Sequence, residues 1–114
     1  MEAKVKEAIV LLKNLEYQLK HEPYGNLNKF TDFAELYQVI DETISDLQNK
    51  KYEGITLSVR VGKTMGYIND ALAFRGLRFS KKQSKAWNLF VHPTDEKLQK
   101  NEIIFKLINQ FGVW

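Results

Sequence analysis

Apolar residues recur three or four positions apart along much of this chain, the spacing that places side chains on one face of an α-helix. Over residues 2–21 the apolar positions are Val5, Ala8, Ile9, Leu12, Leu15 and Leu19. Over residues 33–49 they are Phe33, Leu36, Tyr37, Ile40, Ile44 and Leu47. Each pattern predicts an amphipathic helix with one buried stripe.

The residues between these two helices are typical of a segment that ends a helix. Pro23 and Gly25 follow His21 closely, and neither residue favours continuation of the first helix. Asp32 stands three residues before Glu35, a spacing that predicts a capping box at the start of the second helix, with Thr31 as a competing cap.

The stretch after the polar turn at residues 49–54 fits two patterns. Ile55, Leu57, Val59 and Val61 alternate as a strand would. A longer stripe runs at helical spacing through Leu57, Val61, Met65, Ile68 and Leu72. We therefore favour a helix over residues 56–75, although Gly62 and Gly66 each cost it about 1 kcal/mol relative to Ala. Glycines four apart also let a neighbouring helix approach closely, while their polar flanks exclude a membrane dimer motif.

The remaining chain predicts two further helices. Gly76 ends the third helix, and Ser80 with Gln83 forms a capping box that begins a fourth helix ending near Val91. After the break at residues 92–94, apolar spacing predicts a last helix over 95–110. We expect an all-α fold: one domain spanning 1–114, built as an antiparallel four-helix bundle with an additional C-terminal helical segment and an aromatic tail.

Composition narrows the class of protein. The chain has 114 residues, suited to one domain with a real core, and it has no Cys, which excludes disulfides, thiolate metal sites and thiol catalysis. No apolar run approaches the roughly 20 residues of a membrane span, and no signal-peptide pattern opens the chain. We expect a soluble protein located in the cytoplasm.

Few residues suit enzyme chemistry. His21 and His92 stand at predicted helix ends, where a histidine typically interacts with free backbone carbonyls, and neither has a second histidine at metal-ligand spacing. Lys63 lies in a Gly-Lys-Thr triplet similar to the end of a phosphate-binding loop, but Leu57 occupies the position that requires glycine. We expect no catalytic residue, no metal and no cofactor.

Charge is distributed unevenly. Residues 1–54 carry seven Lys and ten acidic residues, a net −3, whereas residues 55–114 carry ten Lys or Arg and four acidic residues, a net +6. The predicted partner-binding cations are Lys63, Arg75, Arg78, Lys81, Lys82 and Lys85. They suit an anionic membrane surface, an acidic protein patch or a phosphate backbone, or they complement the acidic half of the same molecule. Nucleic acid is the less favoured partner because the fourth helix begins with Lys rather than with the Asn or Arg that reads base edges.

The C-terminus is unusually aromatic. Phe111 and Trp114 lie within the last four residues, where chains are normally polar and frayed. We expect them either to fold back over a groove between helices or to bind a partner.

Two segments resemble one protein family. Residues 75–85, RGLRFSKKQSK, resemble the end of the third helix and the start of the fourth in bacteriocin immunity proteins of lactic acid bacteria. Residues 47–53, LQNKKYE, are similar to the Lys-rich end of the second helix in that family. The resemblance covers about residues 30–92.

The resemblance implies a function without catalysis. Members of that family are cytosolic four-helix bundles that protect a cell from a pore-forming, pediocin-like (class IIa) bacteriocin. They are thought to act on the mannose phosphotransferase permease, the receptor of the bacteriocin, at the inner face of the membrane. Specificity is attributed to the C-terminal half, which here contains Phe111 and Trp114. A small helical interaction module and a nucleic-acid-binding regulator are the alternatives.

Overall fold

The computed structural model describes residues 3–21 and 29–92, and these form four α-helices and no strand. The helices are α1 (Ala3–His21), α2 (Phe33–Asn49), α3 (Ile55–Phe74) and α4 (Lys81–Val91). The all-α prediction is confirmed for this part of the chain, and residues 55–61 are helical rather than extended. The helix predicted over 95–110, with Phe111 and Trp114, lies outside the described residues.

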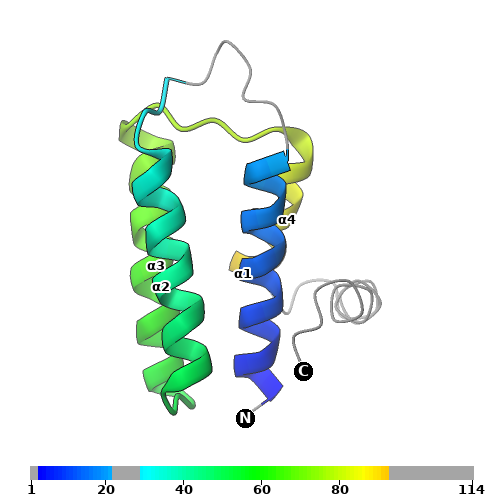
Figure 1. Cartoon of the computed structure of the whole chain (residues 1–114), viewed down its shortest axis with the longest axis vertical. Coiled ribbons are helices and arrows are strands. Elements are labelled where there is room, and N and C mark those ends of the chain that lie inside the picture. The colour runs from blue at the N-terminus through cyan, green and yellow to red at the C-terminus, as the bar shows by residue number, and fades with distance from the viewer. Residues whose placement is uncertain (1–2, 22–28, 93–114) are drawn as a thin grey trace.

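The four helices pack as two pairs joined through α1. Figure 1 shows α2 beside α3 and α1 beside α4, with α1 next to α2. Packing is extensive for α1 with α4, α1 with α2 and α2 with α3, whereas α3 and α4 touch only sparsely. The third helix is therefore held mainly by the second.

The first helix supplies the largest share of the core. Its buried apolar residues are Val5, Ile9, Val10, Leu11, Leu12, Leu15 and Leu19. Val10 and Leu11 lie beside the predicted stripe and are nevertheless buried, because α1 faces α2 on one side and α4 on the other. A helix with two packed neighbours needs a wider apolar face than a helix with one.

A capping box begins α4 and also attaches it to α1. Ser80 Oγ accepts a hydrogen bond from the Gln83 backbone N–H at 3.2 Å, and Gln83 Oε1 accepts one from the Ser80 N–H at 2.8 Å. The Gln83 amide nitrogen donates to the Gln18 carbonyl oxygen in α1 at 3.2 Å. The predicted capping box is confirmed, and the same buried side chain also joins two helices.

The capping box predicted at the start of α2 does not form. Asp32 is the N-cap residue, but its side chain accepts no capping hydrogen bond and instead pairs with Arg75 at the end of α3. A charged partner outcompetes the backbone N–H groups for this carboxylate. The prediction of a cap residue was right, and the predicted role of its side chain was wrong.

The glycines within α3 and directly after it differ in their surroundings. Gly76 has φ +82° directly after the helix, as predicted for a helix stop, and a Cβ added there would lie 3.0 Å from Lys29 Cβ. Gly62 and Gly66 are exposed, and a Cβ on either would meet nothing within 4 Å. The expectation that they bring a neighbouring helix close does not hold among the described helices.

This contrast predicts opposite effects of the same substitution. We expect Gly76→Ala to lower the free energy of unfolding by about 1–2 kcal/mol, because alanine is strained at positive φ and its Cβ would press on Lys29. Gly62→Ala is the matched control, and it should raise that free energy by up to about 1 kcal/mol through helix propensity. Urea denaturation of both variants measures the effect, and equal stability of Gly76→Ala and the parent would contradict it.

Candidate partner-binding surfaces

Five of the six predicted cations lie in one part of the structure. Arg75 and Arg78 belong to the connection between α3 and α4, and Lys81, Lys82 and Lys85 occupy the first turns of α4. Lys63 lies apart from them on an exposed side of α3. It precedes Arg75 by twelve residues, which places it about 18 Å away along the helix. The basic turn, as we call residues 75–85, is thus a compact feature that does not include Lys63.

Arg75 is engaged within the molecule. Its guanidinium forms an ion pair with Asp32, lies 3.9 Å from a Glu35 carboxylate oxygen, and stacks over the rings of Phe30 and Tyr67 at 5.4 and 5.6 Å. The Tyr67 side chain raises the pKa of Arg75 most strongly, and Asp32 raises it as well. Arg75 therefore joins the start of α2 to the end of α3, a role that sequence reasoning missed. Its predicted role toward a partner stays a prediction.

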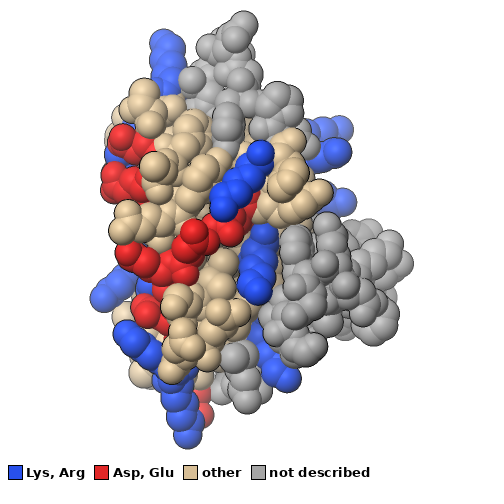
Figure 2. Space-filling model, in the orientation of Figure 1, with Lys and Arg blue, Asp and Glu red and all other residues tan. Residues whose placement is uncertain are grey.

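The opposite charge gathers on the face formed by α1 and α2. Figure 2 shows acidic side chains in a band that crosses α2 and reaches α1, with basic side chains along its edges. The two interpretations of the basic half, as a docking surface or as a complement to the acidic half, both stay predictions.

One carboxylate in this acidic region is mostly buried. The Glu16 side chain is only 16% exposed, and its Oε2 accepts no hydrogen bond from the described residues, with Lys20 Nζ at 3.8 Å. Burial, and to a smaller extent the neighbouring Asp41, raise the pKa of Glu16 to about 7, against smaller opposing effects of Lys20 and Lys13. The sequence pattern does not indicate that Glu16 is buried or that Asp41 of α2 lies beside it.

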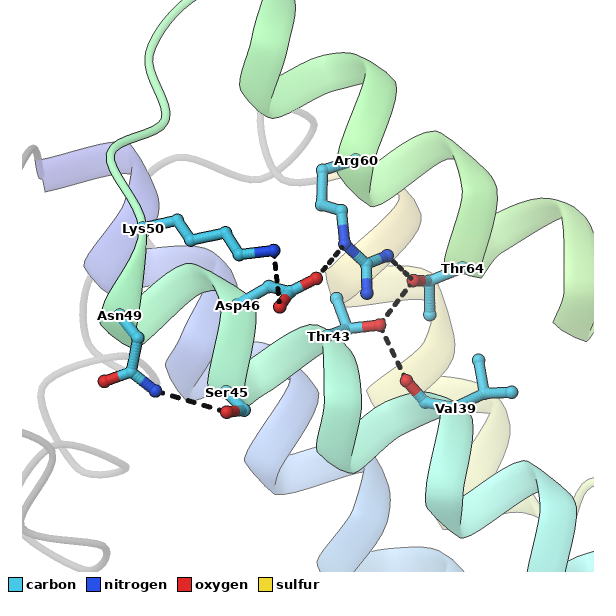
Figure 3. Close-up of polar contacts among 8 residues, drawn as sticks. All are labelled: Val39, Thr43, Ser45, Asp46, Asn49, Lys50, Arg60 and Thr64. Atoms are coloured by element: carbon cyan, nitrogen blue, oxygen red, sulfur yellow. Dashed lines mark hydrogen bonds and ion pairs between the residues drawn. The ribbon is translucent and has the colours of Figure 1, made fainter.

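Polar side chains hold α3 against α2. Figure 3 shows Thr43 Oγ1 2.6 Å from Thr64 Oγ1, in a buried pair whose Thr43 hydroxyl lies 2.7 Å from the Val39 carbonyl oxygen. Arg60 donates to Thr64 Oγ1 at 3.2 Å and to Asp46 at 2.9 Å. The Arg60 guanidinium lowers the pKa of Asp46, with a smaller contribution from Lys50. These polar contacts between α2 and α3 fix the register of α3 on α2.

The sparse contact between α3 and α4 leaves a groove. It has a volume of about 400 Å³ and is open to solvent. Its apolar lining consists of Ala8 and Leu11 from α1, Leu57, Val61 and Met65 from α3, and Phe90 and Val91 from α4, with Lys4, Glu7 and Ser58 as its polar members. Concave apolar surfaces with a few polar groups are the usual form of binding sites. The groove lies where the chain leaves α4 toward residues 93–114.

The histidines behave as helix-end residues. His21 Nδ1 lies 2.9 Å from the Tyr17 carbonyl oxygen, and the His21 ring stacks on Tyr17 with centroids 4.1 Å apart. His92 is the C-cap residue of α4. Within residues 3–21 and 29–92, no three His, Asp or Glu side chains cluster in a way that could hold a metal ion. No helix of the same described segments is both long and apolar enough to cross a membrane.

Comparison with known proteins gave no relative. No family model, no curated protein and no solved structure matches this chain.

The buried carboxylate predicts a pH dependence of stability. Because the pKa of Glu16 is about 7 in the folded chain and near 4.5 in the unfolded chain, the folded state keeps a proton that the unfolded state has lost between these values. The resulting stabilisation is complete below pH 4.5 and is lost as the pH rises through 7. We expect Glu16→Gln to be more stable than the parent at pH 8, by on the order of 2 kcal/mol, and nearly equal to it at pH 5.

Denaturant titration at both pH values measures this difference. Glu53→Gln, on an exposed residue of the α2–α3 connection, is the control and should shift stability by the same small amount at both pH values. A pH slope for Glu16→Gln as steep as that of the parent would assign the dependence to other groups.

Proposed function

We propose that this chain is a bacteriocin immunity protein, folded as an antiparallel four-helix bundle. It acts in the cytoplasm, at the inner face of the membrane, where it binds the mannose phosphotransferase permease engaged by a class IIa bacteriocin. The proposed protection is steric and involves no chemical step, no metal and no cofactor. The partner is a membrane protein complex rather than a nucleic acid or a small molecule.

The observation that carries the proposal is the groove between α1, α3 and α4. A protein that works by holding another protein needs an apolar, partly concave contact surface, because aromatic and aliphatic side chains in such surfaces dominate interface energies. The groove supplies that surface beside the end of α4. The resemblance attributes specificity to the C-terminal half of the chain, and within that half we assign the partner contacts to Phe111 and Trp114.

Two further features support this function. The all-helical fold of residues 3–21 and 29–92 is the class that the resemblance implies. Figure 1 traces consecutive helices up and down the long axis, as in an antiparallel bundle. The basic turn suits an anionic surface such as the cytoplasmic leaflet, where Lys81, Lys82 and Lys85 would set orientation and encounter rate rather than affinity.

We expect the chain to protect a sensitive host. Expressed in a bacteriocin-sensitive strain that carries the mannose permease, it should protect against one or two members of a panel of pediocin-like peptides. Met65→Lys, which places a charge at the groove, and the Phe111→Ala/Trp114→Ala double variant should both lose protection. Growth inhibition zones measure the outcome, and circular dichroism confirms that each variant is folded.

Ala34→Lys is the control for this experiment, because it adds the same charge on an exposed position of α2 and should leave protection intact. No protection across the panel would contradict the proposed function and favour a helical interaction module with a different partner. Protection that survives both Met65→Lys and the double variant would contradict the assignment of the binding surface.

The basic turn predicts a salt-dependent association with membranes. We expect the chain to bind vesicles that contain anionic lipid, with binding weakened as the ionic strength rises above that of physiological salt. The Lys81→Gln/Lys82→Gln/Lys85→Gln variant should bind more weakly and respond less to salt. Co-sedimentation with vesicles measures both quantities. An unchanged salt dependence in the variant would show that these lysines are not the docking residues.

A further inference from the structure

The solvent-facing side of α3 is apolar along its centre. Ile55 and Phe74 are 82% and 83% exposed, and Val59 is 55% exposed, which makes them the most exposed large apolar side chains among the described residues. Gly62, Gly66 and Ala73 are exposed as well. At 100° per residue, a band about 60° wide contains Ile55, Val59, Gly62, Gly66 and Ala73. We call this band the outer face of α3; Phe74 lies outside it, beyond the edge that carries Lys63 and Asp70.

Such a face differs from the usual surface of a helix. A helix that packs on one side normally carries charged residues in the centre of its exposed side. Here the charged residues of the exposed side, Lys63 and Asp70, stand on one edge of the band, and the centre is apolar or glycine. The two glycines meet no described neighbour, although each costs the helix about 1 kcal/mol. Their cost is therefore not offset by packing among the four described helices.

We infer that the outer face of α3 pairs with the same face of a second copy of this chain, with the two helices antiparallel and crossing at Gly66. The inference is independent of the proposed immunity function. A two-fold axis perpendicular to both helices makes the surface self-complementary, as in most homodimers. Gly66 of each copy then lies on the axis. Without side chains there, the two backbones can approach more closely than most helix pairs.

Charge decides the direction of the pairing. Lys63 lies three residues before Gly66 and Asp70 four residues after it, and both stand on the same edge of the band. In an antiparallel pair related by a two-fold axis, the charged edge of one helix lies beside the charged edge of the other. The two edges run in opposite directions. Lys63 of one copy therefore faces Asp70 of the other, and this pair occurs twice. In a parallel pair the edges would cross over, and Lys63 would face the opposite edge, which carries Ser58 and Asn69.

The apolar residues fit the same register. Val59 lies seven residues before Gly66 and Ala73 seven residues after it, so the valine of one copy covers the alanine of the other, with Phe74 adjacent. Each end of the paired surface thus joins one large side chain to one small one, the arrangement that lets helices interlock. The contact is one helix wide, less than a standard interface of about 800 Å² per partner requires, so we expect a weak, concentration-dependent dimer.

Sedimentation equilibrium of the full chain over a dilution series tests the pairing. The average mass should rise with concentration from 13.3 kDa toward twice that value. Gly66→Leu should move the midpoint to at least about tenfold higher concentration, because it places a side chain on the axis. The variant should still fold, since a Cβ at Gly66 meets nothing within 4 Å. Ala34→Leu, the same addition on an exposed position of α2, is the control and should leave the midpoint unchanged.

A charge exchange tests the direction. Lys63→Asp and Asp70→Lys alone should each weaken association at low salt, because each places like charges together twice in the dimer. An equal mixture of the two variants should associate at least as strongly as the parent chain, since both pairs are then opposite in charge. A mass of 13.3 kDa at every concentration would overturn the inference. The antiparallel register would be overturned if Gly66→Leu left the association midpoint unchanged. It would also be overturned if the mixture of the two charge variants associated no more strongly than each variant alone. If the chain is a monomer and Gly66→Leu lowers its stability, the inference would also be overturned. That result would indicate that another segment of the same chain covers the outer face of α3.

Discussion

The packing of α1 against both α2 and α4 is the interaction on which the rest of the described structure depends. Its wide apolar face buries residues from Val5 to Leu19 and joins two helix pairs that otherwise touch little. Apolar burial of this kind is the main favourable contribution to folding. Because α1 takes up the inner faces of α2 and α4, α3 is left to pack mainly on α2. The groove and the outer face of α3 both follow from that arrangement.

The polar contacts complement this apolar core. The Thr43–Thr64 pair and the Arg60–Asp46 ion pair set the register of α3 on α2, while Arg75 fastens the far end of α3 to the start of α2. Arg60, Thr64 and Arg75, from α3 and the residue that follows it, are thus engaged in contacts within the chain. The lysines at the start of α4 stand away from this network, at exposed positions of a different helix pair. Position in the fold thus separates a structural arginine from the lysines proposed to meet an anionic surface.

Local features of the fold could be predicted from the sequence, and features that depend on distant neighbours could not. The helix over residues 55–74 followed from the longer of two competing periodicities, and the Ser80–Gln83 capping box from a spacing of three residues. Asp32 was recognised as a cap residue, but its partner lies 43 residues away and decided its role. The burial of Glu16 beside Asp41 depends on which helices are adjacent, as does the groove between α1, α3 and α4. The exposed face of Gly62 and Gly66 could not be inferred for the same reason, since a spacing of four residues does not reveal which side of a helix is covered.

The double role of Gln83 has a consequence for how the chain folds. At 11 residues, α4 is shorter than the helices of about 12–15 residues that are marginally stable alone in water. The side chain that caps its first turn also reaches the backbone of α1, so completion of the cap and docking of the helix use one amide group. Secondary and tertiary structure at this point therefore form together. We therefore expect the fourth helix to form only when the first is in place, so that the two behave as one cooperative unit although 59 residues separate them along the chain.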